Sequence, residues 1–190
     1  MFTIRDERVA DVAAREALLD AAFGDARFAK TAERLREGRV PADGLSFIAC
    51  SNAGVIGSVR LWNVSAGAGR SALLLGPLAV TRYARSHGVG AALMTHALGA
   101  ARRAGHSAVL LVGDAPYYGR FGFSRQNADG LWLPGPFERE RLLGCELEPG
   151  ALASAGGMIT AAGEIAAIPS LLAHAPALVG NDNVAAHRAA

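Results

Sequence analysis

Cysteine and lysine are scarce in this chain of 190 residues. Two cysteines, Cys50 and Cys145, are too few for a disulfide framework or a cysteine-rich zinc site. Lys30 is the only lysine, so arginine supplies nearly all of the positive charge. The formal net charge is only +2, which argues against a general electrostatic affinity for nucleic acid. We therefore expect no nucleic-acid partner.

Long apolar runs are also missing. Residues 1–20 carry charged side chains throughout and lack the apolar centre of an export signal. The most apolar stretch, residues 165–179, is shorter than a membrane span and is broken by two prolines and a histidine. His174 and His187 show no metal-ligand spacing, and we expect no bound metal. We expect a cytoplasmic protein without a membrane partner.

The hydrophobic pattern predicts helices, then an antiparallel meander, then a strand–helix–strand crossover. The expected helices span residues 9–23, 28–37 and 88–103, with one helical turn at 116–120. The expected strands span residues 2–5, 45–50, 55–62, 71–80, 107–112, 130–133 and 141–147. Gly76-Pro77 interrupts the fourth strand, since proline cannot donate to a strand ladder. This order predicts a mixed α/β fold with a partly parallel sheet.

The C-terminal segment differs in composition from the rest. Between residues 151 and 190, 14 of 40 residues are alanine and only three are charged. The segment has no clear period, and its low charge argues against a solvating tail. We expect one domain over residues 1–150 and an alanine-rich extension over 151–190. The extension is interpreted as a packing arm, a partly disordered appendage or a partner-binding segment.

One stretch combines features that bind an anion. A strand ending at Val80 leads through a short loop into a helix that opens at Gly88 and Gly90. The first turn of a helix has unsatisfied N–H groups, and the two glycines would let a phosphate approach them. Arg85 can add charge-assisted hydrogen bonds. The alternative is a tight strand-to-helix turn that needs glycine only for its backbone.

The wider pattern resembles the GNAT superfamily of N-acetyltransferases. Arg-x-x-Gly-x-Gly at residues 85–90 follows a Leu-x-Val strand, as in the acyl-CoA motif of that superfamily. A second GNAT signature, Tyr-x-Arg-x-Gly-Phe, begins at Tyr118, just after the strand 107–112. Residues 110–123, with their doubled tyrosine, look like a bacterial branch of predicted, mostly uncharacterised acetyltransferases. The resemblance covers roughly residues 1–150.

The resemblance implies a fold and a set of site residues. The fold would be a mostly antiparallel mixed sheet with a parallel, splayed strand pair, flanked by helices. Acetyl-CoA would be the acyl donor, with its acetyl carbonyl beside the bulge at Gly76-Pro77, and Tyr118 would be the general acid. The residues expected to hold acetyl-CoA are Leu78, Ala79, Val80, Arg85, Ser86, His87, Gly88, Val89, Gly90 and Ala91.

The implied reaction is direct attack of a primary amine on the thioester in a ternary complex. Backbone N–H groups near Leu78 would stabilise the oxyanion, and Tyr118 would give a proton to the leaving thiolate. No cysteine acyl-enzyme is expected. The acceptor would be a small molecule or a protein amine, and homodimers are common in this superfamily.

The general base is not evident. Residues 71–80 contain no acid, which leaves Asp114, Asp43, Glu33 or water. For Asp114 we favour the role of a cap for the following turn. Tyr117 is interpreted as structural or as a pocket wall, and residues 60–63 as core, rim or acceptor-pocket lining.

Two alternatives remain. The first is a non-catalytic acyl-CoA-binding or regulatory module on the same fold, motivated by the missing base. The second is a nucleotide-binding or dinucleotide-binding protein. It is disfavoured because the loop lacks both a third glycine at G-x-G-x-x-G spacing and a Gly-Lys-Ser/Thr sequence.

Overall fold

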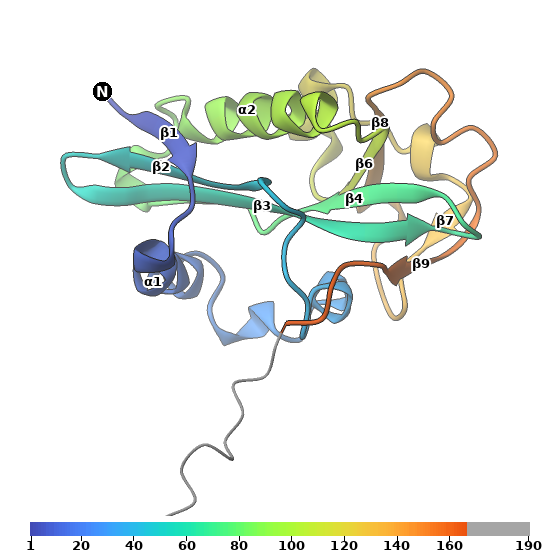
Figure 1. Cartoon of the computed structure of the whole chain (residues 1–190), viewed down its shortest axis with the longest axis horizontal. Helices are drawn as coiled ribbons and strands as arrows, with labels where there is room; N and C mark the ends of the chain where they lie inside the picture. Colours follow the sequence, from blue (N-terminus) through green and yellow to red (C-terminus); the bar gives the residue numbers. More distant parts are fainter. Residues whose placement is uncertain (167–190) are drawn as a thin grey trace, which may run out of the picture.

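A single mixed sheet organises residues 1–166, the part of the chain that the computed structural model describes. Its main path runs β1-β2-β3-β4-β6-β8, while β5 pairs with β3, and β9 pairs with β3 and β7 (Figure 1). The strands are β1 (Thr3–Asp6), β2 (Ser46–Ser51), β3 (Gly54–Ala66), β4 (Ser71–Leu75), β5 (Ala79–Val80), β6 (Ala108–Val112), β7 (Leu131–Trp132), β8 (Leu142–Glu146) and β9 (Gly157–Ala161).

Most strand pairs of the sheet are antiparallel. β2 and β3 form the predicted hairpin, and β6 pairs antiparallel with β8. β4 and β6 are parallel because helix α2 (Val89–Arg103) lies between them in the chain and returns the direction of the strand. The predicted α/β fold, a mostly antiparallel mixed sheet with a parallel strand pair, is confirmed.

Helices cover both faces of this sheet. α2 lies on one face and α1 (Val12–Phe23) on the other (Figure 1). Apolar residues at helical spacing bury Leu93, Met94 and Ala97 of α2 in the core of the first face. Leu18 and Leu19 of α1 pack with Ala79 on the opposite face. A short helix, α3 (Ala115–Tyr118), follows β6 directly.

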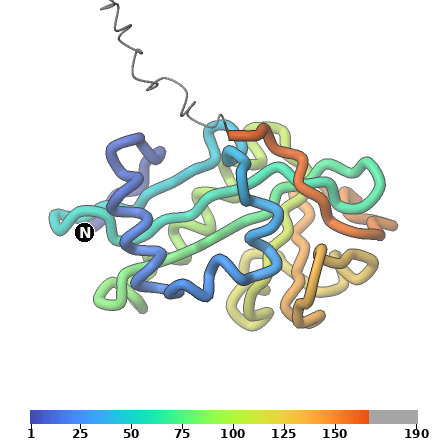
Figure 2. The backbone as a smooth tube through the Cα atoms, turned by 90° about the horizontal axis from the view of Figure 1, so that it is seen from below, coloured from blue at the N-terminus to red at the C-terminus, as the bar shows by residue number. Residues whose placement is uncertain are grey.

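The prediction of a helix over residues 28–37 is wrong. The chain after α1 forms short 3-10 turns, Asp25–Arg27 and Thr31–Leu35, on the face of the sheet that α1 covers (Figure 2). Side chains of the second turn bond to a distant loop: Thr31 donates to the Pro136 carbonyl, and Arg34 donates to the Pro134 carbonyl at 2.8 Å. These tertiary contacts outweigh the weak local preference for an α-helix.

The described part of the alanine-rich extension lies on the sheet. Strand β9 pairs with Val64, Ser65 and Ala66 of β3 and runs parallel to β7. The sheet therefore continues past residue 150, where we expected the domain to end. His174 and His187 lie outside the described residues. Over residues 1–166, no helix is long and apolar enough to cross a membrane.

Candidate functional site

A break between β4 and β5 lies at the centre of the site. Gly76 has φ +132°, a backbone conformation that favours glycine, and its N–H donates to the Arg60 carbonyl at 2.8 Å. The buried indole Nε1 of Trp62 donates to the Gly76 carbonyl at 2.6 Å. The break predicted at Gly76-Pro77 is confirmed. Sequence analysis did not foresee that a tryptophan from β3 holds it in place.

Beyond this break the parallel strands separate. β6 pairs with β4 only at Leu73 and Leu74, whereas β5 turns to β3. Thr81 N–H donates to the Ile56 carbonyl of β3 at 2.9 Å. Because N–H groups alternate along a strand, those of Leu78 and Val80 face the opposite edge, toward the gap. The gap therefore has backbone N–H groups on one side.

The loop after β5 turns sharply into α2. Ser86 has φ +64° and Gly88 has φ +80°, so the chain enters the helix through two left-handed residues. Gly88 is the N-cap, and no side chain caps the helix. The N–H groups of the first turn therefore remain free for a ligand. A Cβ atom on Gly90 would lie 2.9 Å from the Tyr117 hydroxyl, so glycine keeps this turn open.

A groove of about 500 Å³ lies over this helix start. Arg85 and Arg120 line it, and the Arg120 guanidinium lies 4.2 Å from the centre of the Tyr117 ring. Two guanidinium groups beside a helix N-terminus form an anion-binding surface. The predicted residues that line the groove are Val80, Arg85, Ser86, Gly88, Val89, Gly90 and Ala91.

Three other predicted residues lie elsewhere. Leu78 lines a second cavity, described below. Ala79 is buried with α1, so its backbone is the part available to a ligand. His87 is exposed, and its Nδ1 lies 2.8 Å from the Arg85 carbonyl oxygen. Arg120 belongs to the second signature, but the sequence did not predict that it lies beside the loop 85–91.

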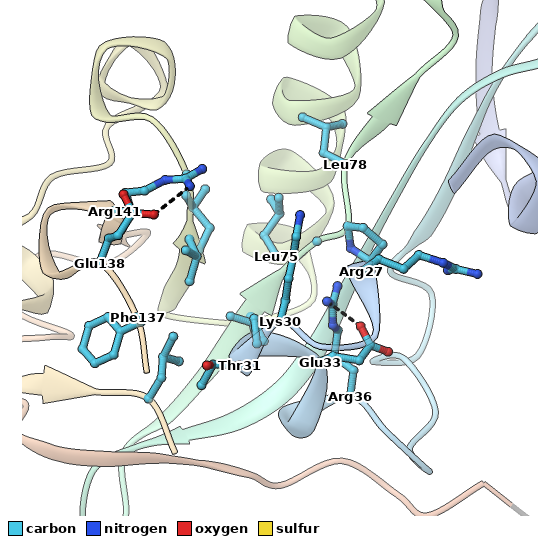
Figure 3. A pocket seen from close by; sticks show the side chains of 18 of the residues that line it. Arg27, Lys30, Thr31, Glu33, Arg36, Leu75, Leu78, Phe137, Glu138 and Arg141 are labelled. Carbon is cyan, nitrogen blue, oxygen red and sulfur yellow. Dashed lines mark hydrogen bonds and ion pairs between the residues drawn. The ribbon is translucent and has the colours of Figure 1, made fainter. Parts of the chain in front are cut away.

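The second cavity, of about 580 Å³, opens where β4 and β6 separate (Figure 3). Its walls come from four segments that are distant in sequence. They are residues 74–78 from the end of β4 onward, residues 111–114 from the end of β6 onward, the segment from the end of α1 to residue 36, and the loop 133–141. Tyr118 also lines this cavity, so its phenol lies where the cavity meets the gap between the strands.

Tyr118 is held by close packing. A Cβ atom on Gly113 would lie 2.7 Å from Cδ2 and 3.1 Å from Cζ of the Tyr118 ring, so the ring packs directly against the glycine. Tyr117 packs edge-on at 4.9 Å between ring centres. Burial raises the pKa of Tyr118 to about 12. The phenol is therefore protonated at neutral pH and is available as a proton donor.

Comparison with known proteins identifies this fold. Residues 42–125 match the family model described as an acetyltransferase (GNAT) domain. The fold of this chain is the mixed α/β fold of GNAT acetyltransferases. It is similar to the GNAT family N-acetyltransferase YhbS from Escherichia coli, solved in complex with CoA, at 28% sequence identity. That match has a TM-score of 0.72 and covers 85% of this chain and 89% of that one.

A second solved structure shares this fold. It is a GNAT family acetyltransferase from Brucella melitensis in complex with acetyl-CoA, at 24% identity and a TM-score of 0.64. The match covers 85% of this chain and 96% of that one. The comparison with curated proteins finds no match.

Two of the three carboxylates considered as bases line the second cavity. Glu33 lies there and pairs with Arg36 at 2.7 Å. Asp114 also lies there, with its carboxylate 3.4 Å from the Arg141 guanidinium. Asp43 is exposed and does not line the cavity.

One expectation about a neighbouring residue needs correction. Asp114 takes the N-cap position of α3, but its side chain makes no capping hydrogen bond, so the favoured capping role is wrong. For residues 60–63 the core interpretation is confirmed, since Leu61 and Trp62 are buried and none of the four residues lines either cavity. Tyr117 forms a wall of the groove, as one interpretation held.

Proposed function

We propose that this protein transfers the acetyl group of acetyl-CoA to a primary amine. The observation that carries the proposal is the arrangement of two hollows around one pair of separated strands. The basic groove at the start of α2 suits phosphates, and the gap leads to a cavity that contains a protonated phenol. The relatives solved with CoA and acetyl-CoA support the choice of donor.

The donor would bind along this path in three parts. Its pyrophosphate would accept hydrogen bonds from the first N–H groups of α2 and from Arg85, with Arg120 adding charge. Its pantetheine arm would hydrogen bond with the free edge of residues 78–80. The thioester would then lie at the break after Gly76, where the second cavity begins.

The chemistry follows from the groups around that break. The neutral amine nitrogen attacks the thioester carbon, a C–N bond forms, and the C–S bond breaks. The N–H of Leu78 faces the gap and would stabilise the developing oxyanion. Tyr118 would give its proton to the departing thiolate. The surplus proton of the amine leaves to a carboxylate of the cavity, Glu33 or Asp114, or to water, and Tyr118 is reprotonated.

The test compares Tyr118→Phe with Tyr83→Phe. Tyr83 is exposed and lines neither cavity, so its variant is the matched control. With acetyl-CoA and a broad panel of amines, release of free CoA is measured. Tyr118→Phe should lower kcat by roughly 10²- to 10⁴-fold and change the affinity for acetyl-CoA less than about twofold. Tyr83→Phe should match the wild type.

Two results would contradict this proposal. Wild-type turnover by Tyr118→Phe at every pH would remove the acid role of the phenol. Tight acetyl-CoA binding by the wild-type protein without transfer to any amine would favour a non-catalytic acyl-CoA-binding module.

A further inference from the structure

The second cavity carries more basic than acidic side chains. Its basic residues are Arg27, Lys30, Arg34, Arg36 and Arg141, and its acidic residues are Glu33, Asp114 and Glu138. Arg27 is compensated from outside the cavity, because its guanidinium lies 2.5 Å from Glu16 and 2.9 Å from Asp20. The balance at the cavity surface therefore depends on the other four cations.

Arg36 is buried and only partly satisfied. Its side chain is 8% exposed, and one carboxylate, that of Glu33, lies within 2.7 Å. Within residues 1–166, its buried Nε has no hydrogen-bond partner. The guanidinium faces the break in the sheet, since Nη1 lies 3.8 Å from where a Cβ of Gly76 would be. A guanidinium has five N–H donors, and a single carboxylate partner leaves some of them for a ligand oxygen that enters the cavity.

Lys30 adds a positive charge to the same wall. No carboxylate of the described chain forms an ion pair with it. Its ammonium lies 4.7 Å from the centre of the Phe23 ring. In Figure 3 its side chain points into the cavity on the side of Leu75, above the pair of Arg36 and Glu33. This cation is available to an anionic group of a ligand.

Apolar side chains line the rest of the cavity. They are Phe23, Leu74, Leu75, Leu78, Leu111, Leu133 and Phe137, together with Pro77 and Pro136. A ligand with an apolar body and one anionic group fits this lining. A polycationic amine would meet repulsion from Lys30 instead. The excess positive charge also favours the neutral form of an amine, which is the form that attacks.

We propose that the acceptor is an amino acid with an apolar side chain. Its carboxylate binds to Lys30 and Arg36, its side chain lies against the apolar wall, and its amine faces Leu78 and Tyr118. This inference rests on the proposed function and specifies its substrate class. It assigns to the turns between residues 25 and 36 the recognition of the acceptor carboxylate.

Three acceptors of one shape test the carboxylate. The three acceptors share an aromatic body and a primary amine. L-phenylalanine carries a carboxylate, L-phenylalaninamide carries a neutral amide in its place, and 2-phenylethylamine carries no such group. With saturating acetyl-CoA, kcat/KM is measured for each and corrected for the fraction of free amine at the assay pH. The kcat/KM of phenylalanine should exceed that of the other two acceptors by at least about tenfold, because only its carboxylate makes the charge-assisted contact.

Variants of Lys30 test the anchor. Lys30→Met keeps the apolar stem and should reduce the preference for phenylalanine over phenylethylamine at least about tenfold, mainly through KM, whereas Lys30→Arg should retain it. Arg125→Met is the matched control, because Arg125 pairs with Asp129 and does not line the cavity. Mass spectrometry after incubation with acetyl-CoA checks whether Lys30 itself is acetylated.

The outcomes separate this inference from the proposed function. Transfer to neutral amines with no preference for the carboxylate, or an unchanged preference in Lys30→Met, overturns the inference alone. Acetylation of Lys30 itself in preference to the added amines also overturns the inference alone. If no amine is acetylated, the proposed function fails, and the inference is then tested by binding of N-acetyl-L-phenylalanine to the CoA-loaded protein. Binding that Lys30→Met loses supports the inference, and no binding overturns it.

Discussion

The contact between Gly113 and Tyr118 makes a sharp prediction about acyl transfer. Gly113→Ala adds one methyl group where the Tyr118 ring now lies. That methyl would approach Cδ2 to 2.7 Å and Cζ to 3.1 Å, and Cε2 more closely still. Carbon atoms in contact lie at about 3.5–4.0 Å. The ring must therefore move by about 1 Å or more away from β6.

This displacement sets the size of the effect. A misplacement of about 1 Å in a reacting group can cost on the order of 100-fold in rate. We expect Gly113→Ala to lower kcat by that factor, because the phenol no longer lies where the thiolate departs. Crowding in a packed site costs about 1–3 kcal/mol of stability, so the protein should still fold.

The assay measures free CoA at saturating acetyl-CoA and amine, alongside acetyl-CoA affinity. Gly119→Ala is the matched control, because a Cβ there would meet no atom within 4 Å and the backbone is helical. It should keep wild-type kcat. Both variants should bind acetyl-CoA as the wild type does. Wild-type kcat in a folded Gly113→Ala would refute the claim that the position of Tyr118 limits the reaction.

Two further predictions concern the groove and the N-terminal ion pair. Gly90→Ala should weaken acetyl-CoA binding several-fold by calorimetry, because the new methyl would lie 2.9 Å from the Tyr117 hydroxyl and narrow the groove; unchanged affinity would argue against phosphates at this turn. The hydrogen bond from Arg5 lowers the pKa of Asp11 to about 2, so the stability it contributes is present above about pH 4 and is lost as the pH falls toward 2. The free energy of unfolding of Asp11→Asn in urea should therefore be lower than that of the wild type by about 1 kcal/mol at pH 7, and the difference should shrink at pH 2. A difference that stays constant would contradict the pKa assignment.

Local signals explain why much of the site could be predicted. The glycines at 88 and 90 and the arginine at 85 act through backbone geometry within one turn, which the sequence displays directly. The break at Gly76-Pro77 and the helix after it are likewise short-range features. Tyr118 was found through its signature, and the structure adds the reason for its position, the bare backbone of Gly113.

The second cavity could not be predicted for the opposite reason. Its wall of 3-10 turns is fixed by bonds from Thr31 and Arg34 to carbonyls at positions 136 and 134, about a hundred residues away. No local pattern encodes such pairings. Strand β9 was missed because an alanine-rich segment shows little alternation, and its pairing with β3 supplies the order that its composition does not.

Thermal unfolding of the protein with acetyl-CoA, with NAD and ATP as controls, tests most directly whether acyl-CoA binds at the start of α2. A ligand at 100 times its Kd adds about 2.7 kcal/mol of stability, which corresponds to a rise in Tm of roughly 5–10 °C for a chain of this size. Acetyl-CoA should produce this rise, and NAD and ATP should produce none. No rise at millimolar acetyl-CoA, or an equal rise with all three, would contradict an acyl-CoA site at the start of α2.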